Sequence, residues 1–198
     1  RTLDASVFVI ENESFAQYCD DGLSPGPYAG AGLKSSVTSF LDLAKKIRGE
    51  AFNPPQPGAA IDECMIAGNV FAGQSEINAS GLKISDIRPL MEFVQLESLD
   101  LSDNQITSLD AFELPFVKAK GGFKKLRTLN LYRDQISDLK PLCTLTQLQY
   151  LDLSNNRILD ASVLEQVPSL LRVDLRNNSQ DLVLKLPPPA VVLTADHG

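Results

Sequence analysis

Side chains that could do chemistry are few in this sequence, and carboxylates are the main candidates. The 198 residues contain one histidine, His197, and three cysteines. A Ser-His-Asp triad, a histidine-ligated metal and a histidine general base are therefore nearly excluded. Asp100, Asp152 and Asp174 recur at corresponding places, and paired carboxylates can act as general acid and base. Asn130 interrupts this aspartate series, so a paired-acid mechanism would need a further acid nearby.

A second candidate group combines tyrosines and arginines in the C-terminal half. These residue types are the most enriched at binding hot spots, because both offer a large, preorganised contact area with a polar tip. The group therefore predicts a ligand-binding surface, to which Asp100, Asp152 and Asp174 also contribute. Alternatively, these are ordinary solvated positions, and Asp174 simply pairs with one of the arginines. The tyrosines and arginines of the group are Tyr132, Arg133, Tyr150, Arg172 and Arg176.

The sequence predicts neither a metal site nor a cofactor site. A calcium ion on the aspartate series is conceivable, but the D-x-[DN]-x-[DN]-G loop is absent. No Walker, Rossmann, G-x-S-x-G or C-x-x-C pattern occurs. We therefore expect a protein that is not an enzyme.

Composition indicates one folded, acidic domain. Hydrophobic residues make up 43% of the chain and charged residues 22%, as in globular proteins. The formal net charge of −7 makes generic binding to nucleic acid or to an anionic membrane unfavourable. No apolar run approaches the roughly 18 residues of a membrane span, so no membrane insertion is expected.

An internal repeat is the strongest pattern in the chain. LESLDLSDNQI (96–106) returns as LRTLNLYRDQI (126–136), LQYLDLSNNRI (148–158) and LLRVDLRNNSQ (170–180), after a degenerate copy at 74–84. Successive copies are 22 residues apart, except for one interval of 30. Alternation around L-x-L places leucines on one face of a short strand and polar residues on the other. Because a 22-residue unit cannot bury its own apolar face, the five copies must stack around a shared core.

The spacing L-x-x-L-x-L-x-x-N-x-I resembles the leucine-rich repeat, in the 22-residue form of bacterial surface proteins such as internalins. The resemblance covers about residues 74–180. It implies an α/β fold: a short leucine-rich repeat solenoid with a parallel β-sheet on its concave face and an N-terminal α-helical cap. Strands about 4.8 Å apart would bring the outward side chains into rows. The first row is Glu76, Ser98, Thr128, Tyr150 and Arg172, the second is Asn78, Asp100, Asn130, Asp152 and Asp174, and the third is Ser80, Ser102, Tyr132, Ser154 and Arg176.

A column of asparagines follows the strands at Asn104, Asn156 and Asn178. A side-chain amide can both donate to and accept from the backbone of adjacent repeats. Asp134 breaks the column, because an ionised carboxylate can only accept hydrogen bonds. We expect a locally imperfect ladder at Asp134 rather than a lost repeat.

Three segments are expected along the chain: an N-terminal helical cap at 1–73, the repeats at 74–181, and a C-terminal cap or tail at 182–198. The repeat at 96–125 carries the 8-residue insertion, within ELPFVKAKGG (113–122). The apolar residues of the tail should cover the last open edge of the solenoid. Its proline run should prevent the strand ladder from continuing there.

Helical spacing of apolar residues predicts a helix over 33–48, ended by Gly49. A second, less regular helix is expected over 59–71. A terminal repeat exposes the edge of the shared core, and these helices would cover that edge.

The N-terminal segment carries a narrower resemblance. SFAQYCDDGLSP around Cys19, an amphipathic helix and DEC ending in Cys64 follow one another as in the caps of secreted bacterial leucine-rich repeat proteins. The resemblance implies a Cys19–Cys64 disulfide and export to the medium, the periplasm or the cell surface. Two reduced, buried cysteines are the alternative. A removed secretion signal or a trimmed sequence would explain the start at Arg1, and Cys143 is expected to be a half-buried free thiol.

A basic run lies in and after the insertion of this acidic chain. It forms either a loop that binds a partner or an anion, or a solvated loop whose charges keep an irregular repeat from sticking to other chains. Its members are Lys118, Lys120, Lys124, Lys125 and Arg127, around two glycines.

The function predicted by this sequence is recognition of a protein partner by the concave strand face, without catalysis, by a monomer. A rigid spacer or self-associating envelope domain without a dedicated ligand is one alternative. A hydrolase that uses the aspartate series is another. Fold alone does not decide among them, because one fold hosts many functions.

Overall fold

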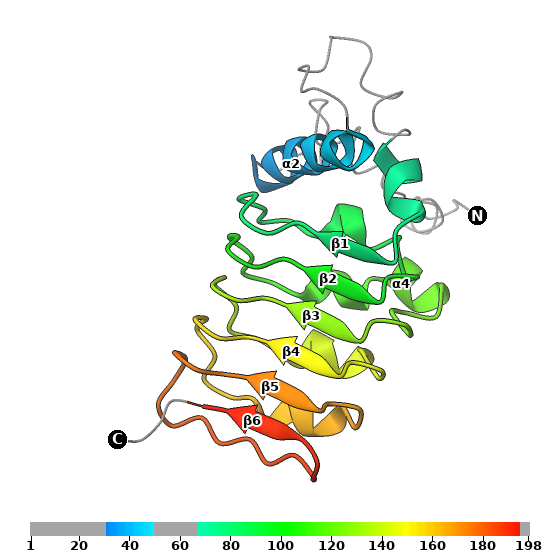
Figure 1. The fold of residues 1–198 in the computed structure, drawn as a ribbon. Coiled ribbons are helices and arrows are strands. Elements are labelled where there is room, and N and C mark those ends of the chain that lie inside the picture. The colour runs from blue at the N-terminus through cyan, green and yellow to red at the C-terminus, as the bar shows by residue number, and fades with distance from the viewer. Residues whose placement is uncertain (1–30, 50–66, 195–198) are drawn as a thin grey trace, which may run out of the picture.

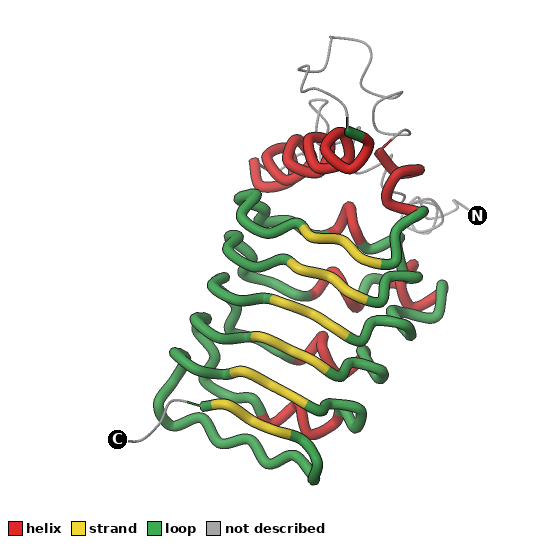
Figure 2. The backbone as a smooth tube through the Cα atoms, in the orientation of Figure 1, coloured by secondary structure: helices red, strands yellow, loops and turns green. Residues whose placement is uncertain are grey.

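The structure is a computed structural model that describes residues 31–49 and 67–194. Strands stack one above another in a single parallel sheet, with short helical returns behind it and a long helix across one end (Figures 1 and 2). This is the expected leucine-rich repeat solenoid. No helix in these two stretches is both long and apolar enough to cross a membrane.

The sheet of the described residues has six strands in sequence order. Each pairs in parallel with the next, and equivalent apolar residues are register partners: Leu99, Leu129 and Leu151 follow one another directly and are buried. Successive repeats therefore fill one interior, as the alternation predicts. The strands are β1 (Glu76–Asn78), β2 (Ser98–Asp100), β3 (Thr128–Asn130), β4 (Tyr150–Asp152), β5 (Arg172–Asp174) and β6 (Val191–Leu193).

Short 3₁₀ helices form the return path behind the sheet. Two of them carry a proline in their first turn, Pro89 and Pro141, where the missing N–H costs no helical hydrogen bond. Leucine and phenylalanine side chains from these returns are buried against the strand leucines. Within the described residues these 3₁₀ helices are Arg88–Leu90, Asp110–Glu113, Lys140–Thr144 and Ser162–Gln166.

The asparagine column forms the expected ladder between repeats. The Asn104 amide donates to the carbonyls of Ala79 and Leu101, while its oxygen accepts from the N–H groups of Leu82 and Ile84. Asn156 and Asn178 make the corresponding bonds two and three repeats further on. Buried backbone groups are thereby paired where strand pairing ends.

The ladder is defective at Asp134, as expected. Its Oδ1 accepts from the Ile106 N–H at 3.0 Å, but its buried Oδ2 has no hydrogen-bond partner in the described chain. Burial, with smaller contributions from the charges of Asp103 and Asp100, raises the pKa of Asp134 from 3.8 to about 7. The repeat itself is kept, because the strand ladder continues on both sides.

Helix α2 (Ala31–Arg48) covers the β1 end of the solenoid (Figure 1). It confirms the helix predicted over 33–48. The buried Ser36 Oγ accepts from the N–H groups of Ser85 and Asp86, at 3.1 and 3.0 Å. Gly32 lets the helix approach closely, since a Cβ there would lie 2.7 Å from the Ser85 hydroxyl.

An aromatic cluster joins α2 to the first repeats. The Phe71 ring lies 6.5 Å from that of Phe40 and 5.6 Å from that of Phe93, between ring centroids. Phe71 belongs to a helical turn over 67–72, which matches the end of the second predicted helix. The remainder of that prediction, and the predicted Cys19–Cys64 disulfide, lie outside the described residues. Cys143 is a half-buried free thiol, as expected.

The C-terminal segment corrects one expectation. The sheet does not stop at the proline run: β6 resumes the ladder, with Val191 N–H donating to Leu171 and Leu175 N–H donating to Leu193. The prolines lie just before the strand, so they remove none of its N–H groups. The tail therefore extends the strand face instead of only covering its edge.

Candidate functional site

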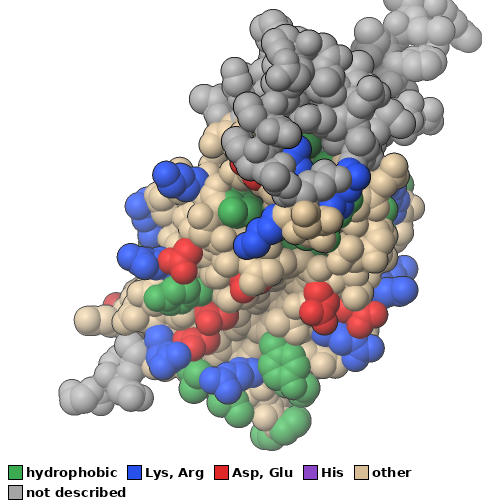
Figure 3. Space-filling view, turned by 45° about the horizontal axis from the view of Figure 1, so that its top comes forward, with side chains coloured by type: hydrophobic (Ala, Val, Ile, Leu, Met, Phe, Trp, Pro, Cys, Tyr) green, Lys and Arg blue, Asp and Glu red, His purple; other side chains and the backbone are tan. Residues whose placement is uncertain are grey.

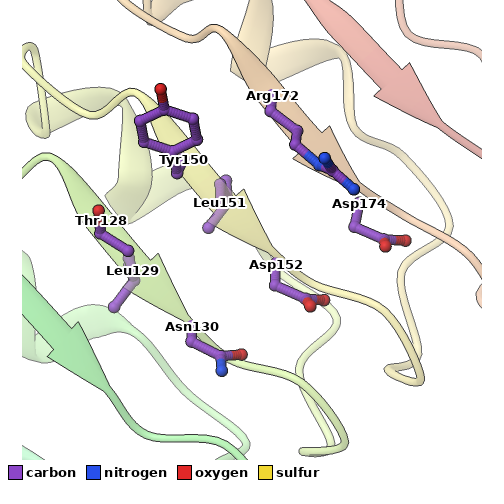
Figure 4. Close-up of a pocket in the computed structure, with 8 residues that line it drawn as sticks. All are labelled: Thr128, Leu129, Asn130, Tyr150, Leu151, Asp152, Arg172 and Asp174. Carbon is purple, nitrogen blue, oxygen red and sulfur yellow. The ribbon is translucent and has the colours of Figure 1, made fainter. Parts of the chain in front are cut away.

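The first two predicted rows exist on the strand face, although Asp174 of the second row is largely buried. The third row does not face outward throughout, because Ser102 and Ser154 are buried. Register pairs place Thr128, Tyr150 and Arg172 side by side in the first row, and Asn130, Asp152 and Asp174 in the second. Figure 4 shows both rows crossing β3, β4 and β5. β6 adds Val191 to the first row and Leu193 to the second, two residues that the sequence analysis missed.

The second-row side chains form hydrogen bonds that stabilise the turn after each strand. Asp152 Oδ1 accepts from the N–H and the hydroxyl of Ser154, at 2.9 and 2.6 Å, and Asp100 does the same with Ser102. Such side-chain turns hold the chain as it leaves the strand. One oxygen of each carboxylate therefore already accepts hydrogen bonds within the turn. The row thus contributes to the stability of the fold before any role in binding.

Asp174 forms an ion pair with Arg176. Arg176 binds it with two nitrogens, the Nε–Oδ1 distance being 3.0 Å. Burial alone would raise the pKa of Asp174, but the side-chain and backbone hydrogen bonds from Arg176 and the charges of Arg176 and Arg172 outweigh it and lower the pKa. Of the two pairings left open, the structure selects Arg176.

Asp152 and Asp174 are neighbours on β4 and β5, so two carboxylates do meet on this face. A general acid in such a pair needs a raised pKa. Arg176 instead helps to lower the pKa of Asp174, and Ser154 occupies Asp152. The pair is thus poorly suited to acid–base work. In the described residues, no group of three His, Cys, Asp or Glu side chains could hold a metal ion.

A shallow groove of about 290 Å³ lies over β3, β4 and β5 (Figure 4). Residues of both rows line it, together with Leu129 and Leu151, which lie between the rows on β3 and β4. Tyr150 is 47% exposed at its edge, and the next residue along the row, Arg172, is exposed as well. The Arg172 guanidinium extends along its strand towards Asp174, yet makes no hydrogen bond or ion pair with the described residues. The groove therefore offers an aromatic surface beside a cation with free donors.

The predicted binding set divides into two parts. Tyr150, Asp152, Arg172 and Asp174 line the groove together. The other four residues do not line it: Asp100 lies on β2, Arg176 holds Asp174, Tyr132 is half-buried after β3, and Arg133 pairs with Asp103 at 3.3 Å.

Apolar side chains gather at the β6 end of the molecule (Figure 3). Val191 is 51% exposed in the first row next to Arg172, and Leu171 and Val183 are also exposed. The proline run concealed this feature in the sequence, although VVL is a typical strand sequence.

A second groove, of about 550 Å³, lies between α2 and β1. This groove was not predicted from the sequence, because it depends on how α2 packs against β1. Its lining comprises Asp42, Leu43, Lys46, Ile47, Gln74, Glu76, Asn78, Ser80 and Leu82.

Family models agree with the observed fold. A model of two leucine-rich repeat copies matches residues 94–144, and a model of one such repeat matches residues 147–168. The chain therefore carries leucine-rich repeats, and domains built from these repeats generally mediate protein–protein interaction and are typically non-enzymatic.

Several known proteins are similar to parts of the chain. An uncharacterised leucine-rich repeat-containing protein of Schizosaccharomyces pombe is 37% identical over 108 residues, which are 52% of this chain and 16% of that protein. An internalin of Listeria monocytogenes has a TM-score of 0.46 at 24% identity, over 64% of this chain and 39% of its own. The ectodomain of a receptor kinase from Arabidopsis thaliana has a TM-score of 0.44 at 19% identity, over 60% of this chain and 67% of its own. The chain thus spans a small part of the yeast protein and less than half of the internalin.

Proposed function

We propose that this protein is a non-catalytic recognition module that binds a protein partner through the C-terminal half of its strand face. The observation that carries the proposal is the row of Tyr150, Arg172 and Val191 on β4, β5 and β6. These three side chains are exposed, adjacent and chemically different. A row of this kind supplies aromatic, charged and aliphatic contacts within one small area.

The physical basis is that each side chain keeps its binding capacity in the free protein. Tyr150 and Val191 can bury apolar area on binding, which is the main favourable contribution at an interface. Arg172 can give its donors to a carboxylate or to backbone carbonyls of the partner. Its neighbour Asp174 is already held by Arg176, so Arg172 does not have to give up an ion pair first.

Affinity capture with paired variants tests the proposal. The full chain, Tyr150→Ala/Arg172→Ala, and the control Glu76→Ala/Ser98→Ala are immobilised and exposed to an extract and culture medium of the source organism. The control removes the two row residues of β1 and β2. We expect at least one protein to be retained by the native chain and the control but lost from the Tyr150/Arg172 variant. Identical retention by all three chains would instead favour the spacer hypothesis.

We further propose that the protein is exported as a monomer with a Cys19–Cys64 disulfide. Support comes from the sequence resemblance to secreted bacterial caps. Because Cys143 is a free thiol, the native protein, denatured without reductant, should show one reactive thiol. Three reactive thiols would contradict the disulfide.

A further inference from the structure

The insertion in the second repeat, at 96–125, is folded and anchored. It contains helix α4 (Pro115–Ala119), whose Val117 is fully buried in the core. Phe112 and Phe123, which flank the inserted stretch, meet edge to face with ring centroids 5.3 Å apart. Both ends of the insertion are therefore fixed by apolar contacts.

The chain reverses direction after α4 through two glycines with left-handed backbone. Gly121 has φ of 88° and Gly122 has φ of 72°, a region that disfavours other residues. The Gly122 N–H donates to the Val117 carbonyl at 2.8 Å, and the Lys124 N–H donates to the Gly122 carbonyl at 2.9 Å. The turn is thus closed by backbone hydrogen bonds.

Residues 113–127 concentrate positive charge. They hold five of the 18 basic residues of the chain and one of its 25 acidic residues. All five basic side chains are exposed, and the one ion pair among these residues is a loose contact of 3.7 Å between Lys118 and Glu113. We call this surface the basic rim; its members are Lys118, Lys120, Lys124, Lys125 and Arg127.

The basic rim lies where the strands begin. α4 sits at that end of the sheet (Figure 1), and Arg127 immediately precedes the first residue of β3, Thr128. A chain segment resting on the strand face could reach the rim without crossing the solenoid. The carboxylates of the second row lie at the opposite ends of the strands, so charge is distributed unevenly across the face.

We propose that the basic rim binds a short acidic segment of a protein. Four of its five cations have no ion-pair partner in the described chain, so a row of carboxylates could pair with them without breaking an existing ion pair. An extended polyanion fits less well, because duplex nucleic acid or an anionic bilayer reaches beyond the rim and meets the acidic remainder of the molecule. A short acidic peptide stays within the rim.

Fluorescence anisotropy of a labelled peptide of alternating glutamate and glycine tests this surface. At about 20 mM salt, where screening is weak, the native chain should bind the peptide. Lys120→Gln/Lys124→Gln/Lys125→Gln should weaken binding about tenfold, as expected from the loss of three exposed charge contacts. The control Lys83→Gln/Lys140→Gln/Lys185→Gln removes three exposed lysines elsewhere and should change binding less than about twofold.

Several outcomes would overturn the proposal. These are no peptide binding by the native chain, equal weakening in the rim variant and the control, or binding of single-stranded DNA or phosphatidylserine vesicles in place of the peptide. A rim variant with unchanged thermal unfolding shows that the loss is local. Tyr150→Ala/Arg172→Ala should leave peptide binding unchanged, so this inference and the recognition role of the groove can fail separately.

Discussion

The two halves of the strand face share one scaffold but differ in their outward side chains. Over β1 and β2 the rows hold Glu76, Ser98 and other small polar residues. Over β4 to β6 they hold Tyr150, Arg172 and Val191. The strands, the side-chain turns and the asparagine bonds recur in both halves. The repeat therefore determines the position of each outward side chain, while the type of that side chain varies from repeat to repeat.

Truncation of a buried strand leucine in each half tests whether the two halves share one core. Leu99→Ala in β2 and Leu151→Ala in β4 remove equivalent buried side chains. Each should lower the free energy of unfolding by about 2–5 kcal/mol, because a cavity is added to the lost burial. Urea denaturation measures both. A cost confined to one half would break the comparison, since it would mean that the halves do not share one core.

The second prediction concerns the single defect between the two halves, Asp134. Its pKa is raised to about 7 when folded, so the folded state holds the proton more tightly than the unfolded state. The contribution of Asp134 to stability should be full below about pH 4 and fall by about 3–4 kcal/mol as the pH rises from about 4 through 7. Asp134→Asn should remove this loss, because an amide supplies the missing donor.

The reverse substitution at the equivalent position of the next repeat serves as a control for this prediction. Asn156→Asp places the same defect in the next repeat and should introduce a comparable loss of stability above neutral pH. Urea midpoints for the native chain and both variants at pH 5 and pH 8 give the comparison. A native chain whose stability does not change between these values would show that Asp134 is ionised at both.

The third prediction sharpens the chemistry of the groove. Arg176→Ala should free Asp174 to pair with Arg172, so any ligand that uses Arg172 binds more weakly although Arg176 lies outside the groove. The pKa of Asp174 should rise, because the hydrogen bonds that lower it are lost. Carboxyl NMR titration follows this change, and stability should fall by about 1 kcal/mol or less. An unchanged Asp174 pKa would show that Arg172 already supplies most of the stabilisation.

The smallest effect is expected in the turns after the strands. Arg133 has φ of 56°, a left-handed conformation that the equivalent Asn155 and Asn177 adopt more easily. Arg133→Asn should raise the free energy of unfolding by about 0.5 kcal/mol, with some of the gain offset by the lost pair with Asp103. Thermal unfolding measures the change. If the variant were clearly less stable, the Arg133–Asp103 ion pair would contribute more to the free energy of unfolding than exposed ion pairs usually do.

Periodicity predicted short strands that stack around one core, because Leu99, Leu129 and Leu151 recur within the same polar alternation. The resemblance to leucine-rich repeats predicted the parallel-sheet solenoid. Periodicity also predicted the defect at Asp134, since the column requires a donor there. The spacing did not reveal that Asp174 pairs with Arg176 or that turns occupy Asp100 and Asp152. Those choices depend on side-chain rotamers and local turns, which a repeat pattern leaves undetermined.

The contacts of α2 with the first repeat have a consequence for how the molecule opens. Each repeat touches its immediate neighbours, so order is transmitted stepwise along the stack. Ser36 and the phenylalanine cluster tie one end down, whereas β6 is paired on one side in the described chain. The rate of amide hydrogen exchange should therefore be lowest near β1 and β2 and increase towards β6. A partner bound at the row of Tyr150, Arg172 and Val191 would contact the end of the stack that opens first. It should therefore slow amide hydrogen exchange near β6.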